Sequence, residues 1–240
     1  MHLVEFADPA PAVRAGAAVF DLCPKNLDVY VSDMPARIEA LRQRGYTFRN
    51  ETFSEVEAPD GTRFREIHLD GHDAINIVLL EVLGQDRAVS TRGFGGIGPL
   101  IVIVADAAAE KAFFATAMGL AQLADNVLSG PEIESMIGLP NGAALDVSIW
   151  GDPELPNGQI EIINYRGVDG RNLYPHARPK ATGILGVSYD SAATAAIEAR
   201  LRHAGIPCRR HTAVEFPERT ADVIEFRSPA GLTIQVRESA

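Results

Sequence analysis

The chain has 240 residues, of which 46% are hydrophobic and 22% are charged, and its formal net charge is −10 at pH 7. This composition is typical of a globular protein with a substantial core and excludes a disordered chain. The negative charge disfavours nucleic acid and anionic membrane surfaces as partners.

The sequence also has few features that indicate a cellular location or a disulfide pattern. No apolar run approaches the eighteen or so residues of a membrane span, and the first residues lack the pattern of a signal peptide. The two cysteines, Cys23 and Cys208, form no CxxC pair and no disulfide framework. We therefore expect a reduced, cytoplasmic setting.

The predicted elements follow one order three times along the chain. Each repeat opens with a short apolar run closed by an aspartate, which predicts a strand leading into a helix. The three runs are 26–33, 99–106 and 183–190. Helices are predicted at 34–44, 107–118 and 191–204, and they end at Gly45, Gly119 and Gly205. Three more strand-like runs follow each glycine, so we expect three βαβββ units.

The expected units divide the chain into two parts. The first part, 1–88, holds a short leading strand at 3–6 and the first unit, and the glycine-rich segment 84–98 is interpreted as a linker. The second part, 97–240, holds the units 97–166 and 182–240, and the long connection between them permits them to pair. The first unit is then left with an unpaired sheet, which predicts a homodimer through that unit. Packing of the N-terminal strand against the first unit is the competing interpretation.

One stretch carries a family resemblance. Residues 112–120, Ala-Phe-Phe-Ala-Thr-Ala-Met-Gly-Leu, resemble the helix end and turn of the vicinal oxygen chelate superfamily, which includes glyoxalase I, bleomycin-resistance proteins and extradiol dioxygenases. The resemblance extends over about residues 24–238. It implies an α+β fold of three tandem βαβββ modules, whose curved mixed sheets form cups around a small ligand. The superfamily hosts several chemistries and some pure binders, so the fold does not settle the activity.

The resemblance also implies where metal ligands would stand. They lie at the start of a module's first strand and in its last strand. The matching residues are Asn26, Pro99 and Gly183 in first strands, and Asn76, Glu161 and Gln235 in last strands. Only Glu161 keeps a carboxylate, and a divalent site needs several converging donors. We expect no metal and no other cofactor; a divalent metal held by other ligands is the less favoured alternative.

Glu161 is the leading catalytic candidate. It alternates with Ile163 and Tyr165, so the three side chains share one strand face. If this face lines the cup, burial raises the pKa of the Glu161 carboxyl, which suits a base that removes a proton next to a carbonyl. The competing interpretation is a glutamate satisfied by a backbone or arginine hydrogen bond.

Two histidines are further catalytic candidates. His68 shares a strand face with Glu66, and a histidine–carboxylate pair can relay protons or bind metal. The competing interpretation is a histidine on the surface of a hairpin. His211 shares a face with Arg209 within the most basic stretch of the chain. If that face lines a cup it would hold a carboxylate or phenolate, and otherwise it is a solvated surface.

Candidates for substrate binding are polar or aromatic residues expected on concave strand faces. They are Asn26, Asp28, Tyr30, Asn76, Trp150, Tyr165, Arg209 and Gln235. Trp150 and Tyr165 could stack on a planar aromatic ligand. Interface contacts and core packing are the competing interpretations.

Three functions therefore remain open. We favour a metal-independent lyase or isomerase that acts on a small aromatic or carbonyl compound, with Glu161 as base. The second is a small-molecule binding or resistance protein without catalysis. The third is a metal-dependent glyoxalase or dioxygenase with displaced ligands, for which the available donors are His68, His72, His176 and His211.

Overall fold

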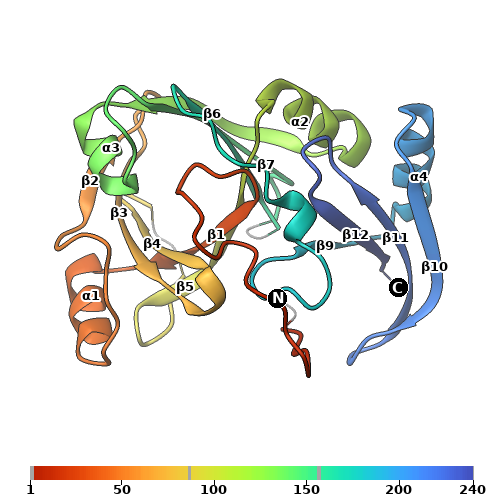
Figure 1. Cartoon of the computed structure of the whole chain (residues 1–240), viewed down its shortest axis with the longest axis horizontal. Coiled ribbons are helices and arrows are strands. Elements are labelled where there is room, and N and C mark those ends of the chain that lie inside the picture. Colours follow the sequence, from red (N-terminus) through yellow and green to blue (C-terminus); the bar gives the residue numbers. More distant parts are fainter. Residues whose placement is uncertain (1–2, 86–87, 156–157, 240) are drawn as a thin grey trace.

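Two sheets organise the molecule. The computed structural model describes residues 3–85, 88–155 and 158–239. Eight strands form one curled sheet in the order β2-β3-β4-β1-β5-β8-β7-β6, and four form a second sheet in the order β10-β11-β12-β9. Figure 1 shows the second sheet, with helix α4 beside it, at one end of the molecule. The predicted α+β fold of three βαβββ modules is confirmed.

Module one supplies half of the large sheet. Its elements are β1 (Pro24–Val31), α1 (Met34–Arg42), β2 (Ser54–Glu57), β3 (Arg63–Asp70), the short helix η1 (His72–Ala74) and β4 (Asn76–Val82). The strand-closing aspartate caps the helix as expected, because the Asp33 side chain accepts a hydrogen bond from the Ala36 backbone N–H at 3.4 Å. Residues 3–6, in contrast, form no strand, so the predicted leading strand is wrong.

Module two supplies the other half. Its elements are β5 (Phe94–Ile103), α2 (Ala107–Phe113), the π-helical turn η2 (Phe114–Met118), β6 (Ala121–Ser129), α3 (Pro131–Ile137), β7 (Ala144–Gly151) and β8 (Ile160–Arg166). Gly119 ends the second helix with φ 76°, in the left-handed region that the sequence predicted for it. Helix α3 is an addition to the predicted unit.

Module three forms the small sheet. The short helix η3 (Tyr174–His176) lies in the connection to it. Its own elements are β9 (Gly186–Ser191), α4 (Thr194–His203), β10 (Cys208–Glu215), β11 (Thr220–Arg227) and β12 (Thr233–Glu238). Among the residues that the structure describes, no helix has the length and apolar character needed to cross a membrane, and even α4 has only ten residues.

The pairing of modules differs from the expectation. Strand β1 pairs antiparallel with β5, so modules one and two share the eight-stranded sheet, and the predicted pairing of modules two and three is wrong. The cause lies in the segment interpreted as a linker, because Gly95 and Gly98 are part of β5. A side chain at Gly98 would stand 3.1 Å from the Asp28 Cβ, so glycine lets the β1 side chains lie over the neighbouring strand.

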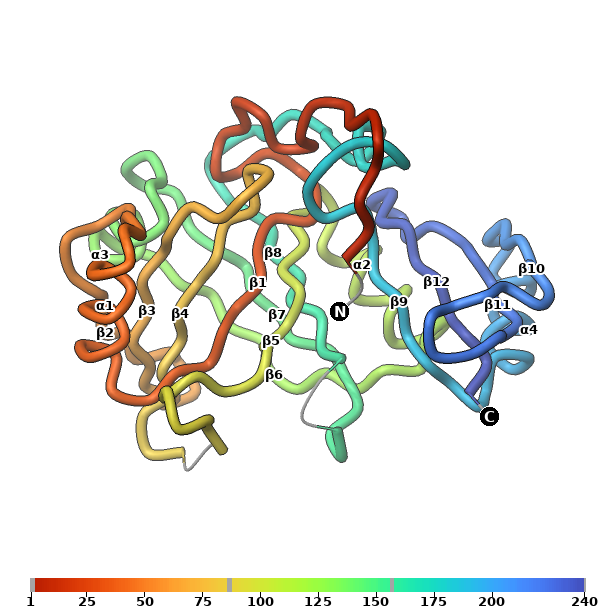
Figure 2. The backbone as a smooth tube through the Cα atoms, turned by 90° about the horizontal axis from the view of Figure 1, so that it is seen from below, coloured from red at the N-terminus to blue at the C-terminus, as the bar shows by residue number. Residues whose placement is uncertain are grey.

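This arrangement removes the reason for a dimer through module one, because its sheet is already continued by module two. Module three instead packs beside module two, and α4 contacts η2 through the Arg200 Nε atom, which donates to the Ala117 carbonyl at 2.9 Å. The N-terminal segment lies against the connection between modules two and three, as Figure 2 shows, and bridges it at Ala10–Ala181 and Leu22–Asn172. The oligomeric state stays a prediction.

Candidate active site

The curled sheet of modules one and two forms a cup. Its concave side encloses a cavity of about 340 Å³, which is within the range of small-molecule sites. The apolar part of the lining comes from both modules and includes Phe64, Leu80, Ile101, Leu145, Val147, Ile149 and Ile163. The polar part includes Lys25, Asn26, Asp28, Tyr30, Glu66, His68, Glu161 and Tyr165. Several ionisable groups are therefore concentrated in a cavity that also has many apolar side chains in its lining.

Glu161 lines the cup together with Ile163 and Tyr165, on the strand face that alternation predicted. In the sheet it lies between Ile101 of β5 and Ile149 of β7. Burial raises the pKa of its carboxyl to about 8, and the negative charge of Glu66 adds to the rise while Lys25 opposes it. A carboxyl of this kind exchanges its proton near neutral pH.

Asp28 is a second acid of the cup and is 7% exposed. Burial raises the pKa of its carboxyl well above the ordinary value, and the charges of Glu161 and Glu66 raise it further. The Asn26 side-chain amide donates a hydrogen bond to Asp28 Oδ1 at 3.0 Å. Asp28 and Glu161 thus lie in one small cavity with the negative charge of Glu66, and this repulsion raises the pKa of both carboxyls.

Lys25 enters the cup through an irregularity of β1. The register of β1 against β5 shifts between Pro24 and Asn26, and both Lys25 and Asn26 line the cavity. The Lys25 Nζ atom donates to the Tyr165 hydroxyl at 2.9 Å and lies 5.4 Å from the centre of the same ring. Burial lowers the pKa of the ammonium to about 7, with smaller contributions from Arg14 and Arg49.

A chain of hydrogen bonds positions Glu66 at the wall of the cup. Arg49 Nη2 donates to Asn76 Oδ1 at 3.0 Å, which leaves the Asn76 Nδ2 group to donate to His68 Nδ1 at 3.0 Å. The His68 Nε2–H then points to Glu66 Oε1 at 2.7 Å. Burial lowers the pKa of His68, although the bond to Glu66 opposes this. The neutral tautomer with the proton on Nε2 is therefore fixed by its neighbours.

The residues at the expected metal positions do not fit a divalent ion. Asn26 pairs with Asn76 and with Ile101, and Ile101 pairs with Glu161, so these four positions meet at the centre of the sheet. The position in module two is thus Ile101 and not Pro99. Isoleucine has no donor atom, and both asparagine amides are engaged in the hydrogen bonds above. No group of three or more His, Cys, Asp or Glu within the described ranges is arranged to hold an ion.

Several predicted site residues lie outside the cup. Trp150 is 6% exposed and belongs to the core, where its Nε1–H donates to Ser148 Oγ at 3.0 Å. It alternates with Ile149, which does line the cavity, so the core interpretation of Trp150 is correct. Arg209, His211 and Gln235 lie in the separate sheet of module three, where Gln235 Nε2 donates to Glu225 Oε2 at 2.9 Å. The prediction that these residues line the cup is wrong, because the sheet of module three is not part of it.

The structure also adds residues that the sequence interpretation missed. Lys25 was overlooked, although a single lysine at the start of a largely apolar strand could have indicated a site residue. Arg49 carries no such signal, because it lies in an irregular segment between α1 and β2. Its part in the site follows only from its contacts with β4 and α3.

Solved structures of other proteins share this architecture. No protein-family model matches the chain, and no curated protein matches it. Glyoxalase I from Zea mays superposes with a TM-score of 0.57 and 12% identity, over 91% of this chain and 68% of the glyoxalase. A putative dioxygenase from Bacillus subtilis superposes with a TM-score of 0.55 and 12% identity, over 93% of this chain and 65% of that protein.

The chain has the glyoxalase fold. The resemblance to the vicinal oxygen chelate superfamily is thereby confirmed for the fold. At 12% identity the likeness carries neither substrate nor mechanism from those proteins to this one.

Proposed function

We propose that this glyoxalase-fold protein is a metal-independent lyase or isomerase that removes a proton next to the carbonyl group of a small aromatic or carbonyl compound, with Glu161 as the general base. The observation that carries the proposal is the Glu161 carboxyl in the cup, with its pKa raised to about 8 by burial and by Glu66. A base of this strength is well matched to a weakly acidic carbon proton at neutral to alkaline pH.

Removal of the proton moves electrons onto the carbonyl group of the substrate. Lys25 and Tyr165 present an amine and a hydroxyl to the same cavity, and they are the groups suited to stabilise that change in an apolar surrounding. Burial and the neighbouring carboxyl charges raise the pKa of Asp28, so its carboxyl holds a proton more strongly than a free aspartate and is suited to return a proton to the substrate. An acid in Asp28 and a base in Glu161 within one cup support an isomerase or lyase cycle.

The cup gives less support to a protein that only binds its ligand. That function requires shape and apolar contact, but it gives no reason to bury ionisable groups, each of which costs free energy. Here Lys25, Asp28, Glu66 and Glu161 all face the cavity. A metal-dependent reaction is disfavoured by the donors at the four central positions.

The test needs no knowledge of the natural substrate. Phenylacetone and a set of small ketones and aldehydes are incubated with the protein in D₂O, and loss of the hydrogens next to the carbonyl is followed by NMR. We expect exchange by the wild type, with a rate that rises as pH passes through about 8, where Glu161 ionises. Glu161→Gln should slow exchange by about 10²-fold or more.

The matched control is Glu225→Gln, which alters a glutamate of the module three sheet and leaves the cup intact. It should exchange at the wild-type rate. Equal rates in Glu161→Gln and wild type would contradict the assignment of the base. Binding of the ketones without exchange by the wild type would identify a binding protein instead.

A further inference from the structure

We propose that Lys25 is a nucleophile that captures the substrate of this cup as an imine, which makes the substrate an aldehyde or a ketone. The inference rests on the proposed function and deepens it, because an imine supplies the electron acceptor that proton removal by Glu161 requires. It assigns a covalent role to a residue of β1 that the positions of the fold's metal ligands do not include.

Lys25 is placed inside the cup. The side chain lines the cavity, and the residue is 3% exposed, so its amine is held inside the cup and away from bulk water. The Nζ atom is anchored by the Tyr165 hydroxyl at 2.9 Å. Tyr165 shares a strand face with Glu161, so the amine and the base approach one cavity.

Within the described part of the chain, the Lys25 amine has no carboxylate as its direct hydrogen-bond partner. A buried ammonium normally has a carboxylate partner, yet Lys25 forms no salt bridge with any residue that the structure describes, and its hydrogen-bond partner is a neutral phenol. Burial therefore favours the neutral amine and lowers the pKa of Lys25 to about 7, although the negative charges of Glu66 and Glu161 oppose this fall. Desolvation of this kind is a recognised way to make lysine nucleophilic at neutral pH.

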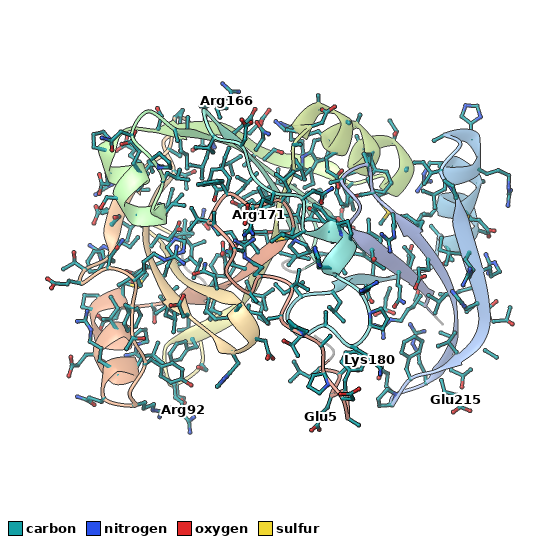
Figure 3. All side chains as sticks on the ribbon, in the orientation of Figure 1. Glu5, Arg92, Arg166, Arg171, Lys180 and Glu215 are labelled. Atoms are coloured by element: carbon teal, nitrogen blue, oxygen red, sulfur yellow. The ribbon has the colours of Figure 1, made fainter. Side chains whose placement is uncertain are left out.

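Lysine is a rare residue in this chain. The 22 basic residues of the chain include only three lysines, so arginine is used almost everywhere that positive charge is needed. Lys111 is paired with Asp125 at 2.7 Å, and Lys180 is an exposed residue 3.6 Å from Asp8, at the surface seen in Figure 3. Lys25 is the lysine that faces the cup. An arginine would supply the charge but cannot form an imine.

The covalent step begins with the neutral Lys25 amine. The Lys25 nitrogen lone pair forms a bond to the carbonyl carbon, and the C=O electron pair moves to oxygen. Proton transfer from nitrogen to oxygen and one further proton from the cup release the oxygen as water, which leaves a cationic C=N bond. Glu161 then removes the neighbouring C–H proton, and the electrons of that bond neutralise the iminium nitrogen to give an enamine. Reprotonation at carbon and hydrolysis by water return the free amine.

Trapping tests this step directly. Wild-type protein is incubated with phenylacetone and sodium cyanoborohydride, which reduces an iminium to a stable amine, and the modified lysine is located by peptide mass spectrometry. We expect labelling of Lys25 at least tenfold above that of Lys111 and Lys180. Labelling spread evenly over the three lysines, or confined to the exposed one, overturns the proposal. Because the map is made on the wild type, it does not depend on how a variant folds.

Variants separate this inference from the proposed function. Lys25→Arg keeps the charge and should lose the adduct, whereas the control Lys180→Arg should keep it. Glu161→Gln should still form the adduct but lose exchange of the neighbouring hydrogens. If the wild type exchanges those hydrogens through Glu161 without any Lys25 adduct, the imine is wrong and the proposed function stands. If the adduct forms without exchange, Lys25 is confirmed as a nucleophile and the role of Glu161 fails.

Discussion

Asp28 is a single residue whose burial lowers the stability of the fold when its carboxyl ionises, while it supplies an acidic group to the cup. Its carboxyl is buried near two other carboxyl groups, and only the Asn26 amide donates to it among the hydrogen bonds described above. In the unfolded chain this group ionises near its ordinary pKa. In the folded chain burial holds the proton to higher pH, so the folded state binds more protons over the interval between the two values.

The sign of the resulting pH dependence follows from that difference. A raised pKa means that the contribution of Asp28 to stability is complete below about pH 4 and is lost as pH rises toward its folded-state pKa. Asp28→Asn removes the ionisation. We therefore expect the variant to match the wild type at pH 4 and to be more stable by about 1 kcal/mol or more at pH 8.

Urea unfolding at the two pH values measures this difference, with the exposed Asp169→Asn as the control that should show no change at either pH. A loss of stability in Asp28→Asn at pH 8 would show that the ionised carboxylate is held by favourable contacts. The raised pKa would then be wrong.

Strand alternation explains which residues of the site were predictable. A period of two placed Asn26, Asp28 and Tyr30 on one face and joined Glu161 to Tyr165, and all five line the cup. Lys25 was missed because the register shift beside it breaks the alternation, so two consecutive residues face the same side. Irregularities of this kind depend on the partner strand and are invisible in one strand's own sequence.

At the scale of elements, the segment between α1 and β2 holds the wall of the cup in place. Arg49 Nη1 donates to the Ile137 carbonyl at 3.1 Å, and the Asn50 side-chain amide donates to the Ser135 and Met136 carbonyls at 3.3 Å each. These carbonyls lie in the last turn of α3, where the helix itself supplies no donor. Module one thereby fixes a helix of module two, and Met136 and Ile137 of that helix line the cavity.

Arg49 is accordingly expected to act as a positioning residue. Arg49→Met removes its bonds to Asn76 and Ile137, and it should cost about 1–3 kcal/mol of unfolding free energy. Because the hydrogen-bond chain through His68 to Glu66 starts at Arg49, hydrogen exchange of phenylacetone should also show a changed pH profile. Denaturant unfolding and the NMR rates check both effects, with the exposed Arg44→Met as control.

If Arg49→Met keeps the pH profile but loses stability, the arginine serves only the packing of α3.

Helix α3 itself was not predicted, since a seven-residue segment between two strands is too short to reveal a helical period. The glycines at the start of β5 led to the opposite error, because part of a strand was interpreted as a linker. Gly95 and Gly98 are typical of a linker, but in this sheet they make room for the side chains of Asp28 and Tyr30.

At the scale of the whole molecule, modules two and three share one core. Phe114 and Met118 of η2, with Trp150 of β7, belong to the same buried cluster as Leu201 of α4 and Phe226 of β11. A buried carboxylate adds to the contact, since Glu110 Oε2 accepts from the Ala230 backbone N–H at 2.9 Å. The sequence predicted that modules two and three are neighbours. It could not show whether their sheets join edge to edge or their helices pack together, because either arrangement buries apolar faces.

The shared core predicts that modules two and three unfold together. Trp150 is the one tryptophan of the chain, so its fluorescence reports on module two, whereas far-UV circular dichroism reports on all modules. Leu201→Ala creates a cavity at a fully buried position of module three and should cost about 2–5 kcal/mol. We expect guanidinium unfolding of this variant to shift to lower denaturant by the same amount with both probes, while Leu155→Ala, at a residue 55% exposed, leaves both midpoints unchanged. If instead the fluorescence midpoint stays at the wild-type value while the circular dichroism develops an earlier step, module three unfolds on its own, and the cup of modules one and two stands independently of it.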